Sequence, residues 1–328
     1  MKRTMLLSAF SALLLGAAAL PAAAASGCPG FLPPNDLKIP VGSARDRGIQ
    51  EAQFHKVLDT VEAIYRPLAA AQGKVLQVNR LWTDPTVNAN ASPSGGKWVL
   101  NLYGGMARHE AITMDGMALV ACHELGHHLG GAPKHAGAFL GWSTIEGQAD
   151  YYASLKCVRQ VFADPSAGAF TRVTDGDGVA QRGCEAAFSR PEERAVCMRA
   201  AMAAKSMAYL LKDLYNDPVT PRFDTPDPKV VADMFASHPG TQCRMDTYLA
   251  GSLCVQPVSA PVSNTDPAAG VCTRSAGFPG GFRPLCWYKP VNAAELQPPA
   301  VRVFGLDEEP LPAFSAPVGA IPWDGFAP

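Results

Sequence analysis

The spacing of apolar side chains along the chain predicts a mainly helical protein. In the first helical stretch, Phe54, Val57 and Leu58 begin a series of apolar residues at helical spacing, which is typical of an amphipathic helix. Further on, Ser189 comes two residues before Pro191, which precedes two glutamates, a pattern typical of a helix start. The helices expected on these grounds cover residues 50–72, 112–130, 144–162, about 189–215, 228–236 and 241–250.

Two segments have the character of strands. They cover residues 74–82 and 97–103, and a loop rich in Pro, Asn, Ser and Gly separates them. The second segment comes shortly before the apolar helix expected over 112–130. We therefore expect an α+β fold, mainly α, with a small sheet beside that helix.

The first residues have the pattern of a signal peptide. Lys2 and Arg3 precede an uncharged apolar run, and small residues lead to a cleavage site after Ala25. The run is shorter than the roughly 20 residues that span a membrane, which disfavours an uncleaved anchor. We expect residues 1–25 to be removed and the protein to be exported, to the periplasm or the medium, without an integral membrane span.

The composition changes again near the other end. After Cys254 prolines recur and no stretch keeps a helical or strand period. The expected organisation is therefore a domain over residues 26–255, followed by an irregular Pro-rich extension over 256–328. We expect this extension to have no large core of its own and to be partly held by disulfides.

Composition also argues against some classes of protein. The 328 residues carry 28 basic and 29 acidic side chains, so the net charge of −1 lacks the basic surplus that phosphate neutralisation requires. This argues against nucleic acid as a partner. The apolar fraction of 48% argues equally against a disordered chain.

Export implies that most of the nine cysteines are paired. Because nine is odd, at least one stays free or pairs with another chain, and Cys122 is the candidate for the free one because it lies within an apolar helix. A lipid anchor on Cys28 is disfavoured, since the usual leucine three residues earlier is missing. Among many connectivities, short loops favour three pairs: Cys184–Cys197, Cys243–Cys254 and Cys272–Cys286.

The candidate chemistry lies in the apolar helix over 112–130. His123, Glu124 and His127 form an HExxH motif. Residues four apart lie on one helix face, so both imidazoles can reach one metal ion. Glu124 lies beside them and can take a proton from a metal-bound water. A pair of surface histidines is the plain alternative, and the apolar surroundings argue against it.

A catalytic zinc ion normally has three protein ligands and one open position. Glu146, at the start of the next helix, is the best third ligand, and Asp150 one turn later can support a ligand histidine. Glu146 also fits a capping box with Ser143, which is the structural alternative. Other candidate third ligands are His128, His135 and His238.

The combination of HELGHH at 123–128 with EGQAD at 146–150 resembles the gluzincin metallopeptidases of the CAAX prenyl protease and HtpX-like type. His238, followed by Pro239 and later by Arg244, matches a further short segment of that family. The resemblance covers about residues 97–250. It implies a zincin-like fold, zinc ligands His123, His127 and Glu146, and Glu124 as the general base.

The resemblance also implies roles for residues around the ligands. Asp150 becomes a support of the zinc site, and His238 and Arg244 become candidates for stabilising the oxyanion or steadying the site. Tyr151 and Tyr152 are lesser candidates, and helix packing is the favoured interpretation for both. The chain departs from membrane-embedded members of the family because it has no internal transmembrane helix and is rich in cysteine.

The sequence therefore predicts an exported zinc metalloendopeptidase that binds one Zn²⁺ per chain and hydrolyses protein or peptide substrates. Two alternatives stay open. One is a zinc-binding envelope protein without activity, and the other is a latent peptidase covered by the Pro-rich tail or by His238.

Overall fold

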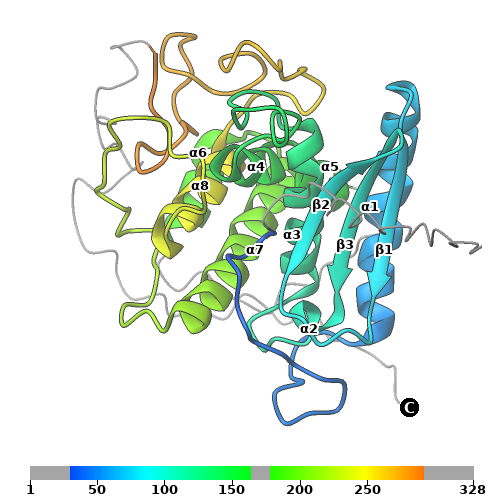
Figure 1. Cartoon of the computed structure of the whole chain (residues 1–328). Coiled ribbons are helices and arrows are strands. Elements are labelled where there is room, and N and C mark those ends of the chain that lie inside the picture. Colours follow the sequence, from blue (N-terminus) through cyan, green and yellow to red (C-terminus); the bar gives the residue numbers. More distant parts are fainter. Residues whose placement is uncertain (1–29, 164–177, 292–328) are drawn as a thin grey trace, which may run out of the picture.

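A computed structural model describes residues 30–163 and 178–291 (Figure 1). The predicted signal peptide, Cys28 and the last part of the Pro-rich extension lie outside these residues. Within them the structure is α+β and mainly helical, as predicted. In chain order the elements are α1 (Glu51–Ala71), β1 (Val75–Leu81), β2 (Ala89–Ser94), β3 (Lys97–Tyr103), α2 (Gly104–Ala107), α3 (Met114–Leu129), α4 (Glu146–Tyr152), a π-helix (Ala153–Cys157), α5 (Val158–Ala163), α6 (Val179–Ala187), α7 (Pro191–Tyr215) and α8 (Thr241–Leu253).

The sheet has three strands in the order β1-β3-β2. The predicted strands β1 and β3 pair in parallel, and β2 pairs antiparallel to β3. β2 falls in the segment expected to be a loop, because its sequence is polar and short and contains Pro93. A proline is tolerated there because β2 is an edge strand, where one backbone face has no neighbour to bond.

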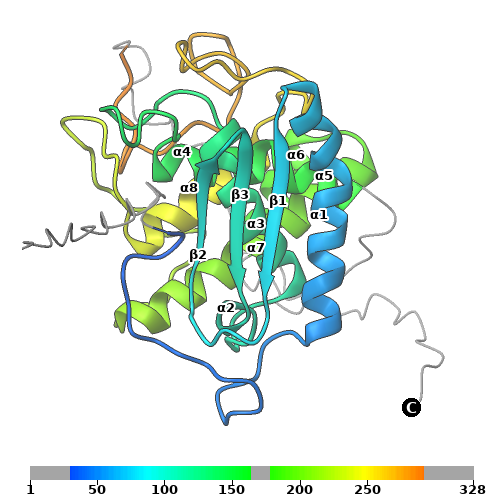
Figure 2. The ribbon, with the colours of Figure 1, turned by 45° about the vertical axis from the view of Figure 1, so that its right-hand side comes forward.

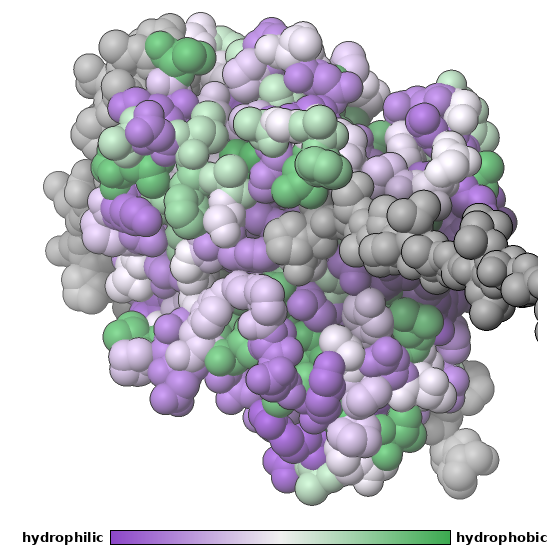
Figure 3. Space-filling model, viewed as in Figure 1, coloured by the Kyte–Doolittle hydropathy of each residue, from purple (hydrophilic) through white to green (hydrophobic). Residues whose placement is uncertain are grey.

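The helices form layers on one side of this sheet. α1 packs against β1 and α3, and α3 packs against β2 and β3 (Figure 2). α7 contacts α3 on the side away from the sheet, and α8 contacts α4 and α7. Hydrophilic and hydrophobic residues are interspersed over the face that Figure 3 shows. None of the helices in the described ranges is long and apolar enough to cross a membrane.

α3 lies at the centre of these layers. The side chain of Thr113 caps its first turn by accepting a hydrogen bond from the backbone N–H of Gly116 at 2.9 Å, and the helix ends before Gly130. Its residues from Met114 to His127 are all buried. A helix that is buried on all sides is normally apolar on every face. The polar residues of the HExxH motif are therefore exceptions that need partners.

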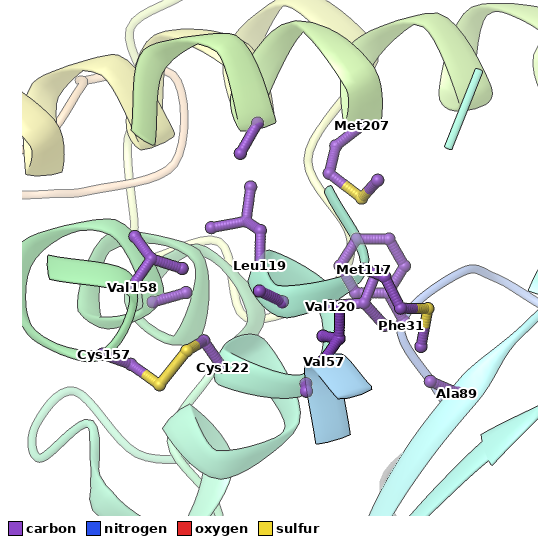
Figure 4. Packing of buried hydrophobic residues seen from close by; sticks show 14 of the residues in the cluster. Phe31, Val57, Ala89, Met117, Leu119, Val120, Cys122, Cys157, Val158 and Met207 are labelled. Atoms are coloured by element: carbon purple, nitrogen blue, oxygen red, sulfur yellow. A yellow bond between two sulfur atoms is a disulfide. The ribbon is translucent and has the colours of Figure 1, made fainter. Parts of the chain in front are cut away.

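Four disulfides cover all cysteines of the described residues, and they correct most of the predicted pairing. Cys184–Cys197 is confirmed, but the other bonds are Cys122–Cys157, Cys243–Cys286 and Cys254–Cys272. Cys122 is buried as expected, yet it is not free: it joins α3 to the π-helix (Figure 4). The short-loop argument failed because residues distant in sequence lie side by side around α8. The four bonds fit an exported protein.

Residues 255–291 contain no helix or strand and pack onto α4 and α8. Trp287 is fully buried, and a Cβ placed on Gly147 would come within 2.2 Å of its ring. The Cys243–Cys286 bond fixes this segment to α8. The prediction of a helix near 228–236 is wrong, because those residues are irregular. Helix α6 was not predicted.

Candidate metal centre

α3 presents two histidines of the motif on one face, as the spacing predicted. His123 and His127 are completely buried, and their rings meet edge to face with centroids 4.7 Å apart. Glu146, the first residue of α4, meets them from the opposite side. Its carboxylate oxygens lie 3.2 Å from Nε2 of His123 and 3.8 Å from Nε2 of His127. One ligand atom from each of the three residues lies within 4.8 Å of the others.

Hydrogen bonds to the far nitrogen of each ring fix which nitrogen faces the cluster. Nδ1 of His127 lies 2.9 Å from the carbonyl oxygen of Thr144, which can only accept, so Nδ1 carries the proton. Nδ1 of His123 donates in the same way to Asp150 at 2.7 Å. In both rings Nε2 is the nitrogen that faces the cluster. This is the arrangement by which outer groups orient metal-binding histidines.

Asp150 is held by an unusually complete set of partners. Nε and Nη2 of Arg244 donate to its two oxygens at 2.8 and 2.7 Å, and the hydroxyl of Tyr248 donates to one of them. Burial alone would raise the pKa of Asp150, but the charges of Arg244 and His123 outweigh it and hold the pKa far below the ordinary value. Asp150 therefore stays ionised and fixes the ring of His123.

The cluster itself is different, because its buried polar atoms have no hydrogen-bond partners. Nε2 of His123, Nε2 of His127 and both oxygens of Glu146 are all without one. Buried polar atoms are normally paired, so such a group of orphaned atoms needs an explanation. Two imidazole nitrogens and a carboxylate are a donor set that zinc prefers. The residues present therefore fit a metal ion.

The capping alternative for Glu146 is wrong. The N-cap of α4 is Ile145, and no side chain caps the helix. The hydroxyl of Ser143 lies near Nδ1 of His127 and donates to the carbonyl of Thr144, so it is engaged away from Glu146. Burial raises the pKa of Glu146, but His127 and His123 outweigh this and lower it to about 2. The carboxylate is ionised and directed at the histidines.

The charges of the two histidines differ in the metal-free protein. Burial lowers the pKa of His127 to about 4. Burial also opposes the charge of His123, but Asp150 and Glu146 outweigh it and raise its pKa to about 9. Ligand nitrogens must be deprotonated. A metal ion would therefore displace a proton from His123 when it binds.

Glu124 lies next to these ligands in α3 and is completely buried. Neither of its oxygens has a hydrogen-bond partner. Burial is the largest cause that raises its pKa, to about 8 in the metal-free protein. A carboxyl group with a pKa near the working pH can both accept and return a proton.

His238 reaches the site, whereas the two tyrosines do not. Nε2 of His238 lies 3.6 Å from Glu146 and 2.7 Å from the carbonyl oxygen of Gly30, to which it donates. The hydroxyl of Tyr151 donates to the carbonyl of Gly281, and Tyr152 is buried in the main core. Packing was the favoured interpretation for both tyrosines, and their contacts agree with it.

The other histidines considered as ligands do not join the cluster. His128 lies between two indole rings, with ring centroids 5.5 Å from Trp98 and 4.8 Å from Trp142. The backbone N–H of His135 donates to Ser143, and its ring is outside the group of convergent ligand atoms. Among the candidates the structure brings Glu146 to the two motif histidines.

Sequence reasoning missed Tyr248 and Phe31. Tyr248 follows Arg244 by four residues in the predicted helix, so helical spacing placed it on the same face. No sequence signal pointed to Phe31, whose ring packs edge-on against His123 with centroids 4.9 Å apart. Neither the family models, nor the curated proteins, nor the solved structures compared with this chain give a match.

Proposed function

We propose that the protein is a zinc-dependent metalloendopeptidase of the gluzincin type, with a zincin-like domain, that cleaves protein or peptide substrates. The observation that carries this proposal is the convergence of His123, His127 and Glu146 beside the unpartnered carboxylate of Glu124. A purely structural zinc site has no use for such a carboxylate. Hydrolysis requires one, because a proton must be moved from water to the leaving amine.

Each residue has a distinct part in this proposal. His123, His127 and Glu146 hold the metal ion, and Asp150 and Thr144 keep the two rings in the tautomer that exposes Nε2. Bound zinc would polarise the scissile carbonyl and lower the pKa of water in the site to about 7. Glu124 accepts the proton of the attacking water and passes it to the leaving nitrogen. His238 donates to the developing oxyanion.

Arg244 is a positioning residue in this scheme. It donates to Asp150 with two nitrogens, and Asp150 in turn accepts from Nδ1 of His123. Its effect on the metal passes through Asp150 to Nδ1 of His123. We expect its loss to weaken metal binding and to leave the identity of the ligands unchanged.

A latent form of the same enzyme is the second candidate, and two observations favour it. The three ligands and Glu124 are completely buried. The N–H of His238 that is proposed for the oxyanion is already bound to the carbonyl of Gly30. A zinc-binding protein without activity would share the ligands but would not depend on Glu124.

The test is cleavage of an unbiased peptide library by the purified protein beside the Glu124→Gln variant, with zinc content measured for both. Gln keeps the size of the side chain but cannot act as a base. We expect one zinc ion per chain in both proteins and cleavage by the unmodified protein only. Glu192→Gln, at an exposed glutamate of α7, is the matched control and should cleave normally.

The other results separate the alternatives. Equal cleavage by both proteins would contradict the role of Glu124. Zinc binding without cleavage by either would favour the latent or the inactive form. Failure of both proteins to bind zinc would reject the metal centre itself.

A further inference from the structure

The connection between α3 and α4 carries a further histidine, His135, that the proposed reaction does not yet use. This connection folds back on itself. An antiparallel bridge joins Lys134 to Thr144, and the backbone N–H of His135 donates to the carbonyl of Ser143 at 2.9 Å. Because Lys134 and Thr144 are opposite each other in this bridge, His135 and Ser143 are opposite each other as well.

The bridge places the side chain of His135 beside His127. Opposite residues of an antiparallel pair carry their side chains on the same face, with Cβ atoms about 4.5–5.5 Å apart. On that face the hydroxyl of Ser143 lies 3.1 Å from Nδ1 of His127. Burial lowers the pKa of His135, the charge of Glu146 opposes this, and His238 lowers the pKa further. His135 is therefore uncharged near neutral pH and lies close to the metal-binding cluster.

The ring of His135 reaches inward from the protein surface. His135 is partly exposed, whereas His127 and Glu146 are completely buried. Nε2 of His135 is nevertheless buried, and it has no hydrogen-bond partner. The ring is outside the group of convergent ligand atoms, so a bound metal ion would not satisfy this nitrogen. Buried polar atoms are normally paired, and an unpaired one beside a candidate site points to a ligand.

His135 differs in this respect from His238, the other histidine next to the ligands. Nε2 of His238 already donates to the carbonyl of Gly30 at 2.7 Å, so this bond must break before His238 can donate to a substrate. His135 has no such bond to break at Nε2. An uncharged imidazole can carry its proton on Nε2 and then donates one hydrogen bond.

We propose that His135 is a catalytic residue whose Nε2–H donates a hydrogen bond to the oxyanion formed at the scissile carbonyl. The inference rests on the proposed peptidase function and adds a donor to it. When water attacks the carbonyl carbon, the electron pair of the C=O π bond moves to the oxygen, and Glu124 takes the proton of the water. His135 keeps its own proton and stabilises the charge on the oxygen. The pair returns when the leaving nitrogen departs with the proton from Glu124.

The first test compares His135→Ala with the unmodified protein, both loaded with zinc. Loss of one oxyanion donor lowers kcat by about 10²- to 10³-fold, and we expect this decrease with KM and zinc content nearly unchanged. His135→Gln keeps an N–H near the position of Nε2 and should recover part of the loss. His55→Ala is the matched control and should cleave normally, because the imidazole of His55 is partly exposed on α1 and lies 3.7 Å from Glu51.

The second test measures binding instead of cleavage. A phosphonamidate peptide carries a tetrahedral, anionic phosphorus group that resembles the intermediate. Its affinity, measured by calorimetry, should fall in His135→Ala by the same factor as kcat. The affinity for the matching substrate peptide, measured in the Glu124→Gln background to prevent cleavage, should stay the same. A residue with only a structural role would weaken both ligands or neither.

The outcomes keep the two proposals apart. Normal kcat and normal phosphonamidate affinity in His135→Ala would overturn the role of His135 and leave the peptidase standing. Loss of zinc from that variant, or equal weakening of both ligands, would overturn it as well. If the unmodified protein binds the phosphonamidate without cleaving peptides, the binding measurement alone decides the role of His135. Equal cleavage by Glu124→Gln, or no phosphonamidate binding by the zinc-loaded unmodified protein, would reject the proposed function and this inference with it.

Discussion

Asp150 and Glu124 are both completely buried carboxyl groups of the same site, yet their surroundings are opposite. Asp150 accepts hydrogen bonds from Arg244, Tyr248 and His123. Glu124 has no hydrogen-bond partner at either oxygen. Their pKa values accordingly move apart, that of Asp150 downward and that of Glu124 upward to about 8. A buried charge with a structural role normally has hydrogen-bond and ion-pair partners in the fold. A carboxylate left without them points to chemistry, and four substitutions test this contrast.

The largest effect on stability is expected from Arg244→Met. It leaves the carboxylate of Asp150 buried without its cation, and breaking such a pair costs about 3–5 kcal/mol. Chemical denaturation should show this loss in the free energy of unfolding. Replacing both residues, as Arg244→Met with Asp150→Leu, should recover much of it. A loss below about 1 kcal/mol in the single variant would mean that the pair is worth no more than a surface ion pair.

Gly147→Ala should have the next largest effect. The added methyl group would meet the ring of Trp287 at 2.2 Å, so α4 or the tryptophan must shift. Overpacking of this kind costs about 1–3 kcal/mol. Because Glu146 is the neighbouring residue, zinc affinity should fall together with stability. Gly240→Ala, where a Cβ meets nothing within 4 Å, is the control. Because Gly240 is the N-cap of α8, this variant should lose no more than about 1 kcal/mol of stability and should keep its zinc affinity.

Asp246 is an intermediate case, with two hydrogen bonds and no cation. It accepts from the N–H of Asp227 and from Gln242, and burial raises its pKa to about 7. The folded state therefore holds the proton of Asp246 more tightly than the unfolded chain. The stability from this proton is complete below about pH 4 and is lost as the pH rises to about 7.

Asp246→Asn removes that titration. The variant should gain stability over the unmodified protein as the pH rises from about 4 to about 7, and the difference should then level off. Denaturation curves at several pH values measure it. A constant difference over this range would mean that Asp246 does not titrate there.

The smallest effect on stability is expected from Glu124→Gln, although it should abolish cleavage. No hydrogen-bond partner is lost when Glu124 is replaced, so the free energy of unfolding of the metal-free protein should stay the same or rise. Thermal denaturation after chelation measures this. A clear loss of stability would show that Glu124 has a structural role, and the contrast with Asp150 would fail.

The parts of this site that sequence could predict are those set by helical spacing. His123, Glu124 and His127 share one helix, and Glu146 and Asp150 follow at one turn's spacing in the next. The disulfides and strand β2 depend on neighbours that are distant in sequence, so local pattern could not supply them. The contact of Phe31 could not be predicted for the same reason, because 92 positions separate it from His123, the residue that it contacts.

The Cys122–Cys157 bond has a topological consequence for the centre. It joins residues 35 apart, and every residue of the cluster lies between its two ends, together with Glu124 and Asp150. The candidate centre is thus enclosed in one covalent ring. A single cut in the connection between α3 and α4 would open this ring without separating the two ligand-bearing helices. A chain cut there would still carry all the candidate ligands on one covalently connected molecule.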